Sequence, residues 1–213
     1  MYIFTAIRVR QVGEIDTAIW LMVGLVGYFM FRKTGDKVTD AINQNMGLLA
    51  YRQVKPIDTL LARAFLEGFL MLVVAIWLIC GAALLGRSFA PVDPLSLMAA
   101  LLGLWLLGLG FGLVLSALYS FASEARILVK VIMRPMYLIS GVIFPLTPLP
   151  APIREILMWN PVANGLEMAR LAITPRYHAP PELDPAYLFE FALISVLIGL
   201  ALQRSFATRI ASR

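Results

Sequence analysis

The sequence predicts an all-α integral membrane protein with about five membrane-crossing helices. Of its 213 residues, 60% are hydrophobic and only 15% are charged, whereas soluble domains have about 45–50% apolar and about 25% charged residues. The apolar residues come in long uncharged blocks rather than in the stripes of a soluble amphipathic fold. The basic residues gather in alternate segments between these blocks, which is typical of multi-pass membrane proteins.

The uncharged blocks give the expected spans. A helix needs about 20 residues to cross a hydrocarbon core of about 30 Å. We expect the whole chain, 1–213, to form one transmembrane domain. Its spans are predicted at about 17–31, 64–86, 95–121, 135–147 and 186–203. The first span is short, but Arg32 and Lys33 can reach the aqueous boundary from its end.

The basic loops orient these spans. Segments 32–63, 122–134 and 204–213 carry 12 of the 18 basic residues, so we expect them, and the C-terminus, to be cytoplasmic. This orientation leaves the N-terminus outside, beside an apolar stub at Met1–Ile7. We therefore expect a further span upstream of the given sequence; the alternative is a protein with five spans.

Composition argues against several other functions. The net charge of +5 follows from the cytoplasmic loops, so we expect no nucleic-acid partner. Cys80 and His178 are the single cysteine and histidine, too few for a disulfide or a zinc site. No GxxxxGK[ST], HExxH or GxSxG motif occurs. We expect no cofactor or metal on this chain, and any energy for transport must come from a partner.

The predicted cytoplasmic segment 38–63 is long for a connection between two spans. Val38, Ile42 and the Leu48–Leu49 pair predict one apolar helical stripe, and Pro56 breaks the helix after it. Asp58 or Thr59 can cap the helix that follows. The segment is either a docking element for a soluble partner or an amphipathic helix on the inner leaflet.

Prolines crowd the start of the predicted outer segment, 148–185. Pro145, Pro148, Pro150 and Pro152 lie within eight residues, and each costs a helix interior about 3 kcal/mol. We expect a helix that rises to about Pro145 and turns, followed by short helices at 153–158 and 162–172. This region is either a gate or an outer loop that rests on the headgroups, anchored by Trp159.

Two further patterns lie on the spans. Gly108, Gly112, Ser116 and Ser120 put small groups on one helix face, for packing within the chain or at a dimer seam. Aromatic residues fall on several spans and either line a channel or anchor the helices at the interfaces. The candidates for channel lining are Tyr28, Trp105, Tyr119 and Tyr137.

Two blocks of sequence resemble a known family. Segment 51–59 (YRQVKPIDT), followed by 61–64 (LARA), resembles the inner-membrane permease of bacterial capsular polysaccharide ABC exporters. Segment 139–146 (ISGVIFPL), Leu149-Pro150 and 159–161 (WNP), with the residues that follow it, are similar to the wider ABC-2 type permease superfamily. The resembling residues after 161 are Gly165, Glu167 and Arg170.

The resemblance implies a permease with six spans, five of them present here, in the bacterial inner membrane. It implies a homodimer that binds a separate cytoplasmic ATPase subunit, where ATP and magnesium would be held, and that exports a lipid-linked acidic polysaccharide. Periplasmic export components and membrane lipids are further expected partners. The family's N-terminal interface helix and most of its first span have no counterpart in this sequence.

The resemblance also assigns roles to residues. The coupling segment maps to about 38–49, with its exit at 51–58, and the outer re-entrant helices to about 148–172. The expected partner-coupling residues are Asn43, Asn45, Tyr51, Arg52, Lys55, Pro56 and Asp58. The expected outer-gate residues are Pro145, Pro148, Pro150, Trp159, Asn160 and Pro161.

Several alternatives stay open. An ABC-2 permease for O-antigen, teichoic acid, a drug or another lipid would have the same fold. An ion-coupled transporter would need midplane ionisable residues, but Glu67 and Glu190 lie at span ends. A membrane-embedded glycolipid enzyme would need clustered acids or histidines, which the sequence lacks.

Overall fold

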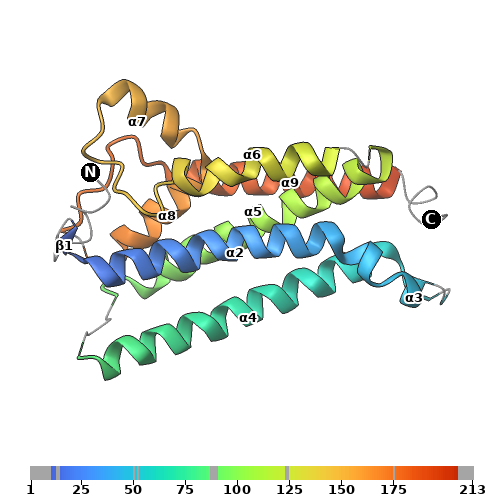
Figure 1. Cartoon of the computed structure of the whole chain (residues 1–213), viewed down its shortest axis with the longest axis horizontal. Coiled ribbons are helices and arrows are strands. Elements are labelled where there is room, and N and C mark those ends of the chain that lie inside the picture. Colours follow the sequence, from blue (N-terminus) through green and yellow to red (C-terminus); the bar gives the residue numbers. More distant parts are fainter. Residues whose placement is uncertain are drawn as a thin grey trace.

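Long helices that run along one axis make up most of the molecule (Figure 1). The computed structural model describes residues 11–12, 15–49, 51, 53–86, 91–122, 125–174 and 176–205. The helices are α2 (Thr17–Gln44), α3 (Met46–Leu49), α4 (Pro56–Leu84), α5 (Pro94–Phe121), α6 (Ala125–Ile139), α7 (Ala151–Met158), α8 (Pro161–Leu171) and α9 (Pro185–Ser205). A two-residue antiparallel ladder, β1 (Gln11–Val12) with β2 (Ile15–Asp16), precedes α2.

Two of the helices, α5 and α8, start with a polar cap followed by proline. Asp93 accepts a hydrogen bond from the Ser96 N–H at 3.0 Å, and Pro94 opens α5. Proline suits the first helical position because its missing N–H would have no partner there. The same arrangement opens α8 at Asn160, while Asp16 caps α2 without a proline.

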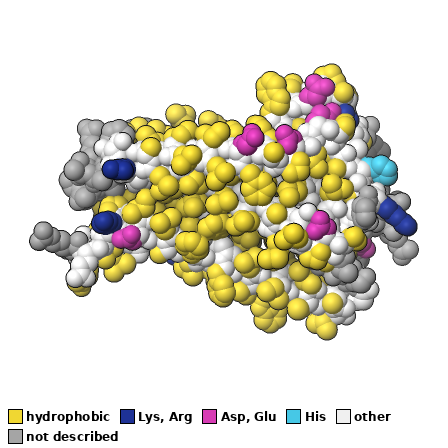
Figure 2. All heavy atoms as spheres, turned by 180° about the vertical axis from the view of Figure 1, so that it is seen from behind, with side chains coloured by type: hydrophobic (Ala, Val, Ile, Leu, Met, Phe, Trp, Pro, Cys, Tyr) yellow, Lys and Arg dark blue, Asp and Glu magenta, His cyan; other side chains and the backbone are white. Residues whose placement is uncertain are grey.

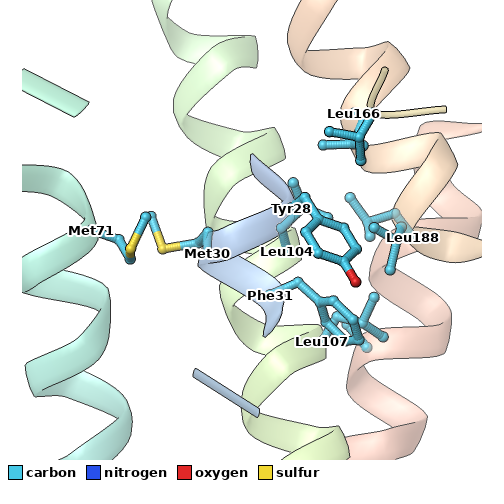
Figure 3. Close-up of a cluster of buried hydrophobic side chains, with 11 residues drawn as sticks. Tyr28, Met30, Phe31, Met71, Leu104, Leu107, Leu166 and Leu188 are labelled. Carbon is cyan, nitrogen blue, oxygen red and sulfur yellow. The ribbon is translucent and has the colours of Figure 1, made fainter. Parts of the chain in front are cut away.

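Helix α5 is the centre of the bundle. It packs most extensively against α9 on one side and α2 on the other, while α4 packs mainly on α2. One buried cluster joins these helices: Met71 of α4 points toward Met30 of α2, and Leu104 and Leu107 of α5 lie beyond them, near Leu188 of α9 (Figure 3).

Hydrophobic side chains cover the middle of the molecular surface in Figure 2, and the Lys and Arg side chains on that face lie near its two ends. Within the described residues, three helices are long and apolar enough to cross a membrane: α4, α5 and α9. Exposed apolar side chains on these helices, such as Trp77 and Leu197, fit a lipid environment. The two ends of the bundle are called the α3 end and the α7 end below.

Three predicted spans differ from the structure at their ends. The span predicted at 64–86 belongs to a helix that already begins at Pro56. The helix that starts at Thr17 does not stop at 31 but continues to Gln44. Arg32 and Asp36, four residues apart, form an ion pair of 2.9 Å on this helix, and such pairs support a helix. The separate amphipathic helix predicted over 38–49 is therefore wrong: Val38 and Ile42 belong to α2, and only the short α3 follows.

The predicted span at 135–147 is helical only as far as Ile139. Helix α6 ends at Ile139 and contains Pro135 within it, and an irregular stretch follows. The predicted cytoplasmic loop at 122–134 is mostly helical. Gly141 takes a positive φ of 68° directly after α6, a conformation that glycine adopts without strain. The chain therefore turns before Pro145 rather than at it.

Candidate functional site

The loop between α2 and α4 forms an open groove at the α3 end. The groove has a volume of about 330 Å³ and is lined in part by Asn45, Leu48, Asp58 and Arg63. Asp58 fixes its rim by accepting a hydrogen bond from the Lys55 N–H at 2.9 Å. This bond satisfies the Lys55 N–H just before α4, as in a capping box. The prediction that Asp58 or Thr59 caps this helix is wrong, because α4 already begins at Pro56 and its N-cap is Lys55.

Apolar side chains stand exposed beside this groove. Tyr51 is 67% exposed and Leu48 is 50% exposed. The structure brings together most of the predicted coupling residues here: Asn43 is exposed in the last turn of α2, Asn45 caps that helix, and Pro56 opens α4. Arg52 lies outside the described residues, as does the stub at Met1–Ile7. Exposed apolar side chains around a polar-rimmed groove are typical of a docking surface.

Helix α6 lies antiparallel to α2 and contacts it at two points. At the α3 end, Arg126 of α6 lies 3.4 Å from Asp40 of α2, and its guanidinium lies 5.2 Å from the centroid of the Tyr119 ring. Farther along, the rings of Tyr137 and Tyr28 meet edge to face, with centroids 5.1 Å apart. Three of the four predicted channel aromatics, Tyr28, Tyr119 and Tyr137, thus lie on or beside one α2/α6 contact.

Trp105, the fourth aromatic candidate, lies at a different contact. Its indole N–H donates to the Ala64 carbonyl at 2.8 Å, which joins α5 to α4. The ring fills the space beside Gly68, where an added Cβ would come within 2.6 Å of the indole nitrogen. In the single chain Trp105 is thus a packing residue between two helices, and a channel role for it stays a prediction.

The small residues of α5 lie against α2. A Cβ on Gly108 would lie 2.6 Å from the Phe31 carbonyl oxygen, and one on Gly112 would lie 2.6 Å from the Val38 Cβ. Ser116 is buried, and Ser120 turns its hydroxyl to the Ala117 carbonyl. Gly108 and Gly112 therefore allow close approach within the chain, the first of the two uses predicted for this stripe.

A buried charged network holds the α7 end together, and little in the sequence signals it. Arg170 and Glu167 of α8 are fully buried and joined at 2.8 Å. Arg170 Nη2 also donates to the Gly141 carbonyl at 2.9 Å, and the guanidinium stacks on Trp20 at 3.6 Å from the ring centroid. One side chain thus ties α8 to α2 and to the turn after α6.

Tyr177 completes this network from the loop between α8 and α9. Its hydroxyl donates to Glu167 at 2.8 Å and accepts from the Trp20 indole at 3.4 Å. Burial, and then the charge of Glu167, raises the pKa of the Tyr177 phenol far above its usual value, so it stays protonated and donates. Spacing put Glu167 and Arg170 on one helix face, but their partners lie too far away in sequence to be inferred.

The predicted outer-gate residues lie in the stretch from the end of α6 to the start of α8. Asn160 caps α8 through the Val162 N–H at 3.0 Å and donates to the Ser140 hydroxyl at 2.9 Å, which links α8 to the end of α6. Trp159 is 75% exposed, and Pro161 opens α8. Pro145, Pro148 and Pro150 lie in the irregular stretch between α6 and α7. Their role as a gate stays a prediction.

A second ion pair fastens α7 to the following loop. Arg154 contacts both carboxylate oxygens of Glu182, at distances from 2.7 to 3.0 Å. The Arg154 guanidinium lowers the pKa of the Glu182 carboxyl and is itself held charged. Because the folded pKa is depressed, the pair contributes stability above the usual Glu value of 4.5 and loses it as the pH falls through the folded pKa.

We therefore expect the effect of Arg154→Gln to depend on pH. At about pH 7 the variant should melt below the parent protein, and at about pH 3.5 the two melting temperatures should converge. The measurement is thermal unfolding of the detergent-purified chain at both values. Arg204→Gln, an exposed change at the far end of α9, is the control. A gap that stays constant with pH would contradict the assigned pair.

Comparison with known proteins identifies the family of the chain. Residues 49–174 match the model of the ABC-2 type transporter family. The chain is 34% identical to the polysialic acid transport protein KpsM of Escherichia coli over 95% of this chain and 78% of that protein. It is 25% identical to the capsule polysaccharide export inner-membrane protein CtrC of Neisseria meningitidis serogroup A, over 94% of this chain and 75% of that protein. The chain belongs to the ABC-2 type transporter family, as a multi-pass membrane permease.

Proposed function

We propose that this chain is the membrane subunit of an ATP-driven exporter of capsular polysaccharide in the bacterial inner membrane. The observation that carries the proposal is the similarity to a polysialic acid transport protein across 95% of the chain. No acid or histidine cluster for enzymatic chemistry accompanies the described helices, and the described residues include no group of three potential metal ligands.

The α3 end is the cytoplasmic end in this proposal. The basic segments 32–63 and 122–134 meet there, and the positive-inside rule assigns such segments to the cytoplasm. The C-terminal residues that follow α9 are then cytoplasmic as well. A separate ATPase subunit docks on the groove beside Tyr51 and Leu48. ATP and magnesium are held by that subunit.

Two copies of the chain and two ATPase subunits complete the transporter. Closure of the ATPase pair moves α3 and the start of α4. Asp58 links the loop to α4, because it accepts a hydrogen bond from the Lys55 N–H at the helix start. The long α2 runs unbroken from this end to the buried network at the α7 end. Motion of α2 therefore reaches the candidate gate directly, and lipid-linked glycan passes between the protomers.

The test is association with the ATPase subunit of the same organism. Tyr51→Ala should weaken binding about tenfold or more, because exposed aromatic residues often dominate an interface. Trp159→Ala, an equally exposed aromatic at the α7 end, should bind like the parent chain. Binding is measured by biolayer interferometry in detergent.

An export assay accompanies this measurement. The parent chain should restore surface polysaccharide in cells that lack their own permease, and Tyr51→Ala should not. Absence of any association between the parent chain and the ATPase subunit would overturn the proposed function.

A further inference from the structure

A stripe of charged residues follows each side of the α2/α6 contact. On α2, Tyr28, Arg32, Asp36 and Asp40 recur every four residues. On α6, Arg126, Lys130 and Arg134 also recur every four residues, and Tyr137 follows three later. Residues with this spacing share one helix face. Each helix therefore presents a continuous charged stripe that ends in a tyrosine.

The two stripes lie opposite each other in register. They touch at one end through Asp40 and Arg126 and at the other through Tyr28 and Tyr137. The two contacts are about 18 Å apart along α2 and about 16 Å apart along α6, at about 1.5 Å per residue. The matching lengths place Lys130 near the level of Asp36 and Arg134 near the level of Arg32.

The charges on this face do not balance. It carries four cations and two carboxylates, and the carboxylates are already engaged: Asp36 with Arg32 at 2.9 Å and Asp40 with Arg126 at 3.4 Å. Lys130 and Arg134 are exposed and form no ion pair with any described residue. Arg32 Nη1 is buried and has no hydrogen-bond partner among the described residues.

The residues around Lys130 and Arg134 on α6 are exposed and apolar, including Ile127, Val131 and Ile132. Cations that lie among exposed apolar side chains beside a membrane face water or an anionic partner rather than lipid tails. Because α6 buries none of its own residues, both cations are free to meet such a partner.

We propose that this α2/α6 face, with Lys130 and Arg134 at its centre, binds the anionic groups of an acidic glycan as it leaves the cytoplasmic side. The inference rests on the proposed function and assigns particular residues of this chain to the binding of an acidic cargo. Cations spaced about 6 Å apart along the helix form successive weak binding sites, so that the carboxylates or phosphates of a glycan can move from one to the next. The charged stripe ends at Tyr28 and Tyr137, whose ring faces are apolar.

Binding of a sialic-acid oligomer to the full chain tests this proposal. The chain is placed in nanodiscs of phosphatidylcholine, and binding is followed by microscale thermophoresis at low and high salt. Lys130→Gln with Arg134→Gln should weaken binding about tenfold. Lys33→Gln with Lys37→Gln is the matched control, because it removes the same charge from the neighbouring face of α2, and it should change binding less than twofold. Binding should weaken as salt rises.

Three results would overturn the inference. The first is binding of the sialic-acid oligomer to the parent chain that is no tighter than binding of a dextran oligomer, and the second is an equal loss of affinity in both double variants. The third result concerns Lys130→Gln with Arg134→Gln. If this double variant binds the glycan like the parent chain but has lost binding to phosphatidylglycerol nanodiscs, the two cations contact the lipid surface instead. Association with the ATPase subunit should be unchanged in both double variants. If the parent chain itself does not bind the ATPase subunit, it is the proposed function that fails.

Discussion

Replacing Arg170 by methionine is expected to destabilise the folded chain by about 3–5 kcal/mol, because it leaves the buried carboxylate of Glu167 without its cation. Methionine keeps much of the side-chain volume, so the loss comes from charge and hydrogen bonds rather than from a cavity. The bonds to the carbonyls of Gly141 and Val142, at 2.9 and 3.3 Å, are lost in the same step. Thermal unfolding in detergent should show a melting temperature lower by about 10 °C or more.

Two further variants make this expectation specific. Arg204→Met makes the same change at an exposed position and should leave the melting temperature nearly unaltered. Glu167→Gln combined with Arg170→Met removes both charges, and the amide oxygen of the new glutamine side chain can still accept a hydrogen bond from the Tyr177 hydroxyl. The double variant should therefore be more stable than Arg170→Met alone, as expected for a buried ion pair. Parent-like melting of Arg170→Met would refute the assigned network.

The network also explains why the short helices at the α7 end are ordered. Helix α7 has eight residues and α8 eleven, lengths at which an isolated helix is marginal in water. Arg170 and Asn160 fasten α8 to the turn after α6, and Arg154 fastens α7 to Glu182. A gate built from these helices would move as a unit with α2, because Trp20 lies beneath the Arg170 guanidinium.

Much of the fold could be predicted from composition and charge. The helix predicted at 95–121 is observed as Pro94–Phe121, and the one at 186–203 as Pro185–Ser205. These segments are bounded by proline, loops and charge, and they are apolar throughout. Long uncharged runs in a hydrophobic chain leave few alternatives to a spanning helix.

Helices that carry charges were the hard part to predict. Three basic residues led segment 122–134 to be interpreted as a loop, although their four-residue spacing keeps them on one face of α6. Arg32 likewise ended the predicted first span, although its ion pair with Asp36 lets α2 continue. Charge patterns assessed by their helical spacing, rather than by their number, would have identified both helices.

The candidate site divides in the same way. The segment that lines the groove at the α3 end could be singled out because its residues are nearly contiguous in sequence, so that local rules apply to them. Its role in coupling stays a prediction. The buried network was not predicted because Trp20, Gly141, Arg170 and Tyr177 converge from four segments. A sequence without structure cannot tell a buried Glu–Arg pair from an exposed one, since both follow the same i,i+3 spacing.

The second large effect is expected at Gly112, one of the positions where α5 and α2 lie in close contact. A Cβ there would lie 2.6 Å from the Val38 Cβ and 2.9 Å from the Gly35 carbonyl oxygen. The second contact is with backbone and cannot be relieved by a rotamer change. Gly112→Leu should therefore force the two helices apart and destabilise the chain by about 3 kcal/mol or more, as overpacking does.

Gly81 of α4 provides the matched control, because a Cβ there would meet nothing within 4 Å. Leucine is a better helix former than glycine by about 0.8 kcal/mol, so Gly81→Leu should be neutral or stabilising. A destabilised Gly112→Leu beside a neutral or stabilised Gly81→Leu separates the effect of tight packing from any general effect of leucine on a membrane helix. Thermal unfolding of both variants in one detergent measures the difference, and a loss of similar size at the two positions would contradict the close α2/α5 contact. Because Val38 lies on α2, which leads into the loop that lines the groove at the α3 end, Gly112→Leu should also lower the proposed ATPase association, whereas Gly81→Leu should leave it intact.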